Sequence, residues 1–159
     1  MNAPLHLVLD TNTVLALWLF RDPGLTALAA LIDGGATMLY SRDDALEELR
    51  RVLAYAQFGA DTVTQAGILA AYRERVVRLP PAGFPGTSGH VPPAVLPPCR
   101  DRDDQKFLEI AAQAPATHLV TRDKALLKLA RHRMVRDRFA ILTPERFVAA
   151  MPPGIAAPR

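Results

Sequence analysis

The chain has 159 residues, of which 50% are hydrophobic and 22% charged, and its formal net charge is +3. This composition excludes a mainly disordered chain, and the length fits one globular domain. A single cysteine, Cys99, excludes an internal disulfide framework and a multi-cysteine zinc site. Because we find neither a long apolar run nor a basic leader, we expect a cytoplasmic protein without a membrane segment.

The charge is unevenly distributed. Residues 120–139 contain seven Lys or Arg against two Asp or Glu, whereas residues 1–100 contain eight against nine. A local basic zone beside isolated acidic residues favours a polyanionic partner. The alternative is an ordinary solvated helix face.

Short apolar strands alternate with helices along the chain. We predict strands at 5–9, 37–40, 117–121 and 139–142. The helices are expected near 12–18, 25–32, 42–56, 61–78, 101–113, 124–132 and 144–148, with Ser41 capping the third. This alternation is typical of an α/β domain with a mainly parallel central sheet and helices on both faces.

The predicted domain covers residues 1–150. Within it, residues 80–98 are rich in proline and glycine and contain no charged side chain, which predicts a loop or an extended excursion. Clear elements resume afterwards, so we expect this segment to interrupt one domain rather than to separate two. Residues 151–159 are expected to form a frayed tail.

Acidic residues follow two of the predicted strands. Asp10 comes directly after the first strand, Asp123 comes just after the strand at 117–121, and a helix follows each. Because ligands bind beyond the carboxyl ends of parallel strands, we expect the two carboxylates to meet at one edge. The alternative is that each carboxylate only caps its helix.

A third acid lies on the apolar face of a predicted helix. Asp104 precedes Phe107 by three residues and Leu108 by four, which predicts that it points into the protein. A carboxylate in that position needs backbone donors, a cation or a metal. The alternative is a buried helix cap. Asp101 is a competing cap, and Asp103 lies off the apolar face.

The fourth candidate acid is one of two adjacent residues, Glu47 and Glu48, which lie on different faces of the predicted helix. Glu48 lies at the edge of an apolar stripe, beside Val52, from where it can reach a cleft. Glu47 lies opposite the stripe, next to Arg51, which predicts a solvated side chain. A solvated position is also the alternative for Glu48.

Together these acids predict a metal site, because like charges do not cluster without a counter-cation. Oxygen ligands favour a hard divalent cation, Mg²⁺ or Mn²⁺, which activates water and shields the charge of a phosphate. The basic zone is then expected to hold a nucleic-acid backbone, through Arg122, Lys124, Lys128 and Arg131.

The order and spacing of these acids resemble the PIN-domain family of metal-dependent ribonucleases. The matching words are LDTN at 9–12, a segment from Ser41 to ELRRVL at 48–53, DRDDQKFLEIA at 101–111 and VTRDKALL at 120–127. The resemblance implies a three-layer sandwich with five parallel strands, one more than the periodicity predicts. It also implies a set of metal ligands, Asp10, Glu48, Asp104 and Asp123, with Asn12 and Thr121 as supporting polar residues. Glu47, Asp101 and Asp103 leave the second and third acid positions open.

The resemblance further implies the toxin of a toxin–antitoxin pair, dimeric and neutralised by a small protein. We therefore expect a metal-dependent endoribonuclease that hydrolyses RNA phosphodiester bonds. One alternative is a catalytically silent PIN-like module that binds RNA or protein. Another is a phosphatase or phospho-acceptor with Asp10 as the nucleophile. That chemistry calls for a second Asp two residues on, where the chain has Asn12.

Overall fold

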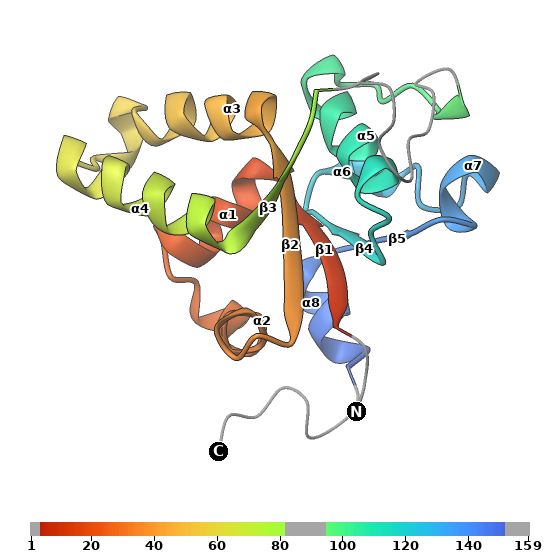
Figure 1. Ribbon diagram of the computed structural model, residues 1–159, viewed down its shortest axis with the longest axis horizontal. Coiled ribbons are helices and arrows are strands. Elements are labelled where there is room, and N and C mark those ends of the chain that lie inside the picture. The colour runs from red at the N-terminus through yellow and green to blue at the C-terminus, as the bar shows by residue number, and fades with distance from the viewer. Residues whose placement is uncertain (1–3, 82–94, 152–159) are drawn as a thin grey trace.

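The computed structural model describes residues 4–81 and 95–151. Its five strands form one sheet in the order β3–β2–β1–β4–β5, and all four neighbouring pairs are parallel (Figure 1). The strands are β1 (Leu5–Leu9), β2 (Thr37–Arg42), β3 (Val76–Leu79), β4 (His118–Val120) and β5 (Ala140–Leu142). The predicted α/β fold is confirmed, with the fifth strand that the family resemblance implied.

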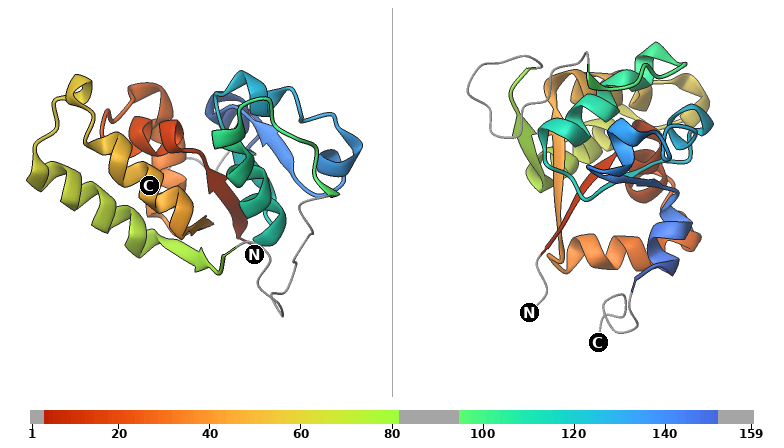
Figure 2. Two further views of the ribbon diagram at one scale, coloured as in Figure 1. Left: turned by 90° about the horizontal axis from the view of Figure 1, so that it is seen from above. Right: turned by 90° about the vertical axis from the view of Figure 1, so that its right-hand side faces the viewer.

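Helices cover both faces of the sheet, because successive strand residues point to opposite sides. Leu7 and Leu9 of β1 enter one core and Val8 enters the other. The left view of Figure 2 shows β1 between the two groups of helices. The first core contains α1 (Thr11–Trp18), α2 (Thr26–Asp33), α3 (Asp43–Leu53), α4 (Thr62–Arg75) and α8 (Pro144–Ala149). The second contains α5 (Gln105–Gln113), α6 (Lys124–Leu127) and α7 (Arg133–Arg136).

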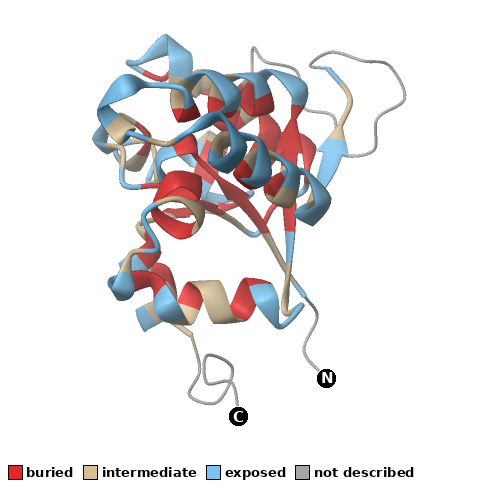
Figure 3. Cartoon of the chain, turned by 90° about the vertical axis from the view of Figure 1, so that its left-hand side faces the viewer, coloured by how far each residue is buried: buried red, intermediate tan, exposed pale blue. Residues whose placement is uncertain are grey.

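Three short 3-10 helices complete the described elements: η1 (Pro23–Leu25), η2 (Ala56–Phe58) and η4 (Arg102–Asp104). The central strands are the most buried part of the chain, and the outer surfaces of the helices are exposed (Figure 3). Gly35 follows α2 with a φ of 76°, a left-handed conformation that glycine adopts without strain. The predicted stop of this helix at the glycine pair is therefore confirmed.

The strand order places a topological switch point between β1 and β4. From β1 the chain builds outward to β2 and β3, and it later returns to the other side of β1 as β4 and β5. The strands β1 and β4 are joined at their carboxyl ends, where the amide of Asp10 donates to the carbonyl of Val120, the last residue of β4, at 3.3 Å. In open parallel sheets, ligands bind in the crevice at such a point.

The helix predicted over 61–78 is too long. The helix α4 ends at Arg75, and the next residues form β3, which pairs with β2 through Val76 and Leu39. The spacing of apolar residues continues across this boundary, so periodicity alone extends the helix. The adjacent β-branched residues Val76 and Val77 favour a strand. Figure 1 shows α3 leading away from the sheet and α4 returning to it.

Two further local predictions are wrong. Ser41 does not cap a helix, because β2 extends to Arg42 and buries it, and α3 begins at Asp43. The basic helix predicted over 124–132 is too long, because α6 ends at Leu127, and a separate short helix, α7, begins only at Arg133. Hydrogen bonds from Leu129 and Ala130 reach carbonyls only three residues back, which tightens the chain into turns after Leu127.

The predicted start of the last helix is confirmed. Thr143 caps α8 by accepting from the Arg146 amide at 3.1 Å, and Pro144 is the first helical residue. Most of the Pro/Gly-rich segment, 82–94, and most of the expected tail, 152–159, lie outside the described residues. In the described part of the chain, no single helix is long and apolar enough to cross a membrane.

Candidate metal centre

All four predicted acids line one small pocket at the switch point. Its volume is about 120 Å³, and its lining consists of Asp10, Thr11, Asn12, Glu48, Val52, Asp104, Phe107 and Asp123. The acids come from four separate segments: the ends of β1 and β4, the middle of α3 and the start of α5. Thr121 lies directly behind the pocket, where its hydroxyl contacts Asp10. The fold therefore brings together residues that are up to 113 positions apart.

Asp10 is held in a fixed orientation by three hydrogen bonds. Its Oδ1 accepts from the Thr13 amide at 2.9 Å and from the Thr13 hydroxyl at 2.6 Å. Its Oδ2 accepts from the Thr121 hydroxyl at 2.6 Å. Only 4% of Asp10 is exposed, and this burial raises its pKa while the bonds from both threonines oppose the rise. Asp10 therefore caps α1, as the alternative interpretation predicts, and it also lines the pocket.

Thr121 links the two strand-end acids. While its hydroxyl donates to Asp10, the same oxygen accepts from the Asp123 amide at 2.9 Å. Asp123 in turn caps α6, because its Oδ1 accepts from the amides of Ala125 and Leu126 at 2.9 and 3.1 Å. One fully buried hydroxyl thus sets the relative position of two carboxylates.

Asp104 has no capping role. It stands at the N-terminal end of α5, yet its side chain makes no capping hydrogen bond there. Asp101 performs that task one turn earlier, where its Oδ1 accepts from the Asp103 amide at 3.0 Å. Of the residues predicted to compete for the cap, Asp101 therefore makes the capping hydrogen bond and Asp104 does not. The Asp104 carboxylate remains available in the pocket.

Glu48 is paired with a cation that the sequence analysis missed. Its Oε1 accepts from Lys106 Nζ at 2.9 Å, and its Oε2 accepts from the Thr11 hydroxyl. Both partners of the ion pair are mostly buried, with 15% and 17% of their side chains exposed. Glu47 instead pairs with Arg50 on the exposed face of α3, with 52% of its side chain exposed. The geometry therefore places Glu48, and not Glu47, in the pocket.

The pocket concentrates negative charge. Burial first, and then the nearby carboxylates of Asp123, Asp101, Asp10 and Glu48, raise the pKa of Asp104 from 3.8 to about 7. Burial and, to a lesser extent, repulsion between the carboxylates both disfavour the charged form of Asp104. The Lys106 ammonium neutralises only part of that charge.

A comparison with protein families agrees with this geometry. The family model described as PIN domain matches residues 6–125, about three quarters of the chain and all four pocket acids. The chain belongs to the PIN domain family. PIN domains are generally nucleases, which typically use divalent metals. No curated protein and no solved structure matches this chain.

The donor chemistry of this PIN domain fits a hard divalent cation. Four carboxylates around one pocket are the ligands that Mg²⁺ and Mn²⁺ prefer. In the described residues, however, no three acidic, His or Cys side chains are placed to hold one ion in their present orientations. The oxygens of Asp10 face two threonines, and Glu48 faces Lys106. Metal binding therefore requires some of these side chains to reorient.

The predicted RNA-binding residues of the PIN domain lie outside this pocket. Arg122 is already engaged, since it donates to Glu145 at 2.9 Å and to Asp22 at 3.0 Å. Lys124, Lys128 and Arg131 are at least partly exposed on or near α6, and no ion pair between described residues involves them. Arg122 thus ties the loop after β4 to α8 and η1, whereas the other three are accessible to a ligand.

We expect Thr121→Val to destabilise the PIN domain by about 1–3 kcal/mol. The change removes a donor from buried Asp10 and an acceptor from the Asp123 amide, and unpaired buried polar groups are costly. The measurement is the midpoint of urea unfolding. Thr37→Val is the matched control, because the buried Thr37 hydroxyl has no partner among the described residues. An equal effect of both changes contradicts the linking role of Thr121.

Proposed function

We propose that this PIN domain is a metal-dependent endoribonuclease that hydrolyses RNA phosphodiester bonds. The observation that carries the proposal is the pocket in which Asp10, Glu48, Asp104 and Asp123 meet at the switch point of a parallel sheet. A pocket of this kind, with one carboxyl group at a pKa of about 7, is typical of a functional site.

In this proposal Asp10, Asp104 and Asp123 hold Mg²⁺ or Mn²⁺, and Glu48 binds directly or through water. The ion, when bound, supplies water activation and shields the negative charge of the scissile phosphate. Thr13 and Thr121 hold Asp10 in orientation, and Asn12 lines the pocket as an exposed polar group. Lys124, Lys128 and Arg131 are proposed to hold the RNA backbone outside the pocket.

The test is cleavage of a mixed RNA pool by the purified full chain, with Mn²⁺, with Mg²⁺ and with EDTA. We expect cleavage with at least one of the metals and none with EDTA. A parallel pool of single-stranded DNA tests whether the substrate is RNA. If the folded protein cleaves nothing with either metal, the nuclease proposal fails. The silent RNA- or protein-binding module then becomes the better account.

We also propose that the chain acts in the cytoplasm as the toxin of a toxin–antitoxin pair and as a homodimer. The resemblance of its acidic sequence motifs to those of the toxin subgroup supports this role. Induced expression of the chain alone is expected to stop growth of a bacterial host, and co-expression of the product of an adjacent short gene is expected to restore it. Light scattering after size-exclusion chromatography gives the oligomeric state. Unimpaired growth during expression of active nuclease contradicts the toxin role.

A further inference from the structure

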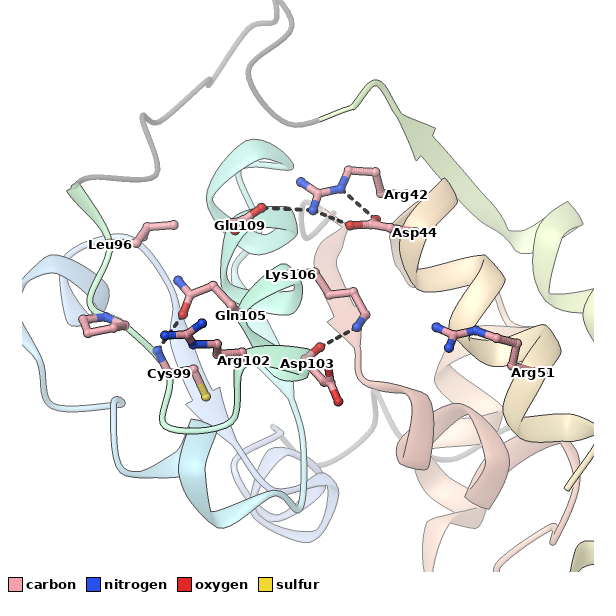
Figure 4. A pocket seen from close by; sticks show the side chains of 11 residues that line it. Arg42, Asp44, Arg51, Leu96, Cys99, Arg102, Asp103, Gln105, Lys106 and Glu109 are labelled. Carbon is pink, nitrogen blue, oxygen red and sulfur yellow. Dashed lines mark hydrogen bonds and ion pairs between the residues drawn. The ribbon is translucent and has the colours of Figure 1, made fainter.

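A second, larger pocket adjoins the acidic one. Its volume is about 650 Å³, and it lies between α3 on one side and α5 with residues 96–102 on the other (Figure 4). The ion pair between Lys106 and Glu48 stands at the boundary, since Lys106 lines the larger pocket and Glu48 lines the acidic one. We call this larger pocket the side chamber.

Two guanidinium groups line the side chamber without a partner in the described part of the chain. Arg51 lies one helical turn after Glu48 on α3, and Arg102 belongs to η4 on the opposite side (Figure 4). Both are exposed, and no ion pair between described residues involves either. Arg42, which also lines the chamber, is by contrast buried and committed to Asp44 and Glu109 at 2.7 and 3.0 Å.

One part of the chamber wall is apolar, and the rest is lined by polar and charged side chains, Asp44, Asp103, Gln105, Lys106 and Glu109. Leu96 and Cys99 are buried, and Pro98 lies between them on the exposed surface. Gln105 fixes this segment, because its Oε1 accepts from the Cys99 amide at 2.5 Å and its Nε2 donates to the Pro97 carbonyl at 3.3 Å. The chamber therefore combines a short apolar wall with two arginines that take part in no ion pair between described residues, while its acids Asp44 and Glu109 are paired with Arg42.

We propose that the side chamber binds one unpaired nucleotide next to the scissile phosphate. The inference rests on the proposed function, because the acidic pocket must hold that phosphate. Arg51 and Arg102 pair with the neighbouring phosphate, since guanidinium groups match phosphate oxygens in shape and charge. The base lies against Leu96 and Pro98. The chamber volume is within the range of small-molecule sites, about 300–1,000 Å³.

A base that lies in this chamber is unavailable for pairing with a complementary strand, because recognition of unpaired nucleotides uses splayed bases. We therefore expect the chamber to discriminate against a duplex.

The test measures binding separately from cleavage. The probe is a fluorescein-labelled single-stranded RNA of mixed sequence, and anisotropy is recorded with the full chain in EDTA and again in Ca²⁺. We expect Arg51→Ala and Arg102→Ala each to weaken binding about tenfold. Because both arginines pair with one phosphate, the double change is expected to lower the slope of log affinity against log salt by about 0.7, the value for one lost phosphate contact. A duplex RNA of equal length is expected to bind more weakly and to be insensitive to both changes.

Matched controls are available beside each arginine. Arg50→Ala removes a cation that is paired with Glu47 outside the chamber, and Arg100→Ala removes one that does not line it. Both are expected to change affinity less than twofold. Unchanged affinity and salt slope in the Arg51/Arg102 double variant overturn the proposal, as does the absence of wild-type binding in both conditions. If the wild type cleaves RNA while the double variant binds normally, the chamber proposal fails and the nuclease survives. If arginine-dependent binding occurs without any cleavage, the nuclease fails instead.

Discussion

Asp104→Asn is expected to abolish metal-dependent cleavage, with a loss of about a thousandfold or more. A bound ion contributes several kcal/mol to catalysis, and each 1.36 kcal/mol corresponds to a factor of ten in rate. Asp104 is the most informative acid to change, because its side chain makes no capping hydrogen bond. The same change at Asp10 also alters its bonds with Thr13 and Thr121, which mixes catalysis with structure. The measurement is the initial rate of RNA cleavage with Mn²⁺.

Two neighbouring acids provide matched controls for this result. Asp101→Asn removes a charge three residues away, and asparagine retains the ability to cap η4. Glu47→Gln removes a charge next to Glu48 on the exposed face of α3. Both variants are expected to retain cleavage within a few-fold of the wild type. Full activity of the Asp104 variant, or an equal loss in the Asp101 variant, removes Asp104 from the proposed site.

The same Asp104→Asn change is expected to stabilise the metal-free protein above pH 7. Because the pKa of Asp104 is about 7 in the folded chain against 3.8 normally, the folded state retains a proton that the unfolded state has lost. The unfolded state therefore binds fewer protons between these values, so stability falls as the pH rises from about 4 to 7. Asparagine does not ionise and avoids this loss.

Thermal unfolding in EDTA at pH 5 and pH 8 measures the effect. Asp104 is partly exposed and solvent screens its charge, so we expect a gain of about 2–4 °C at pH 8, the shift that roughly 1 kcal/mol causes in a domain of this size. The gain at pH 5 is expected to be much smaller. Mn²⁺ is expected to stabilise the wild type more than the variant. A variant that is less stable than the wild type at pH 8 contradicts the repulsion argument.

The positions of the acids could be predicted because they depend on short-range patterns. Asp10 and Asp123 follow apolar strands, and parallel strands bring their ends to one edge. Asp104 and Glu48 could be placed from the apolar stripes of their helices. Their roles as metal ligands stay predictions, while their common pocket is a feature of the fold.

Other features depend on contacts that no local pattern encodes. The pairing of Lys106 with Glu48 joins residues 58 positions apart on two helices, and it needs a particular side-chain orientation at each end. The strand β3 could not be predicted, because its apolar residues continue the helical spacing of the apolar residues in α4. Only the pairing of β3 with β2 decides between helix and strand. The cations of the side chamber were missed for a similar reason. Arg51 and Arg102 become neighbours of the acids only when α3 and η4 pack together.

The position of β4 beside the central strand β1 has a consequence for protein synthesis. A growing chain emerges from the ribosome in sequence order, so β1, β2 and β3 are available long before β4. Asp10 obtains its Thr121 partner, and the pocket obtains Asp123, only after that strand inserts beside β1. An incomplete polypeptide therefore lacks the assembled acidic pocket until synthesis has passed Asp123, about three quarters of the way along the chain. If the finished molecule degrades RNA, this order of assembly protects the message from which it is being translated.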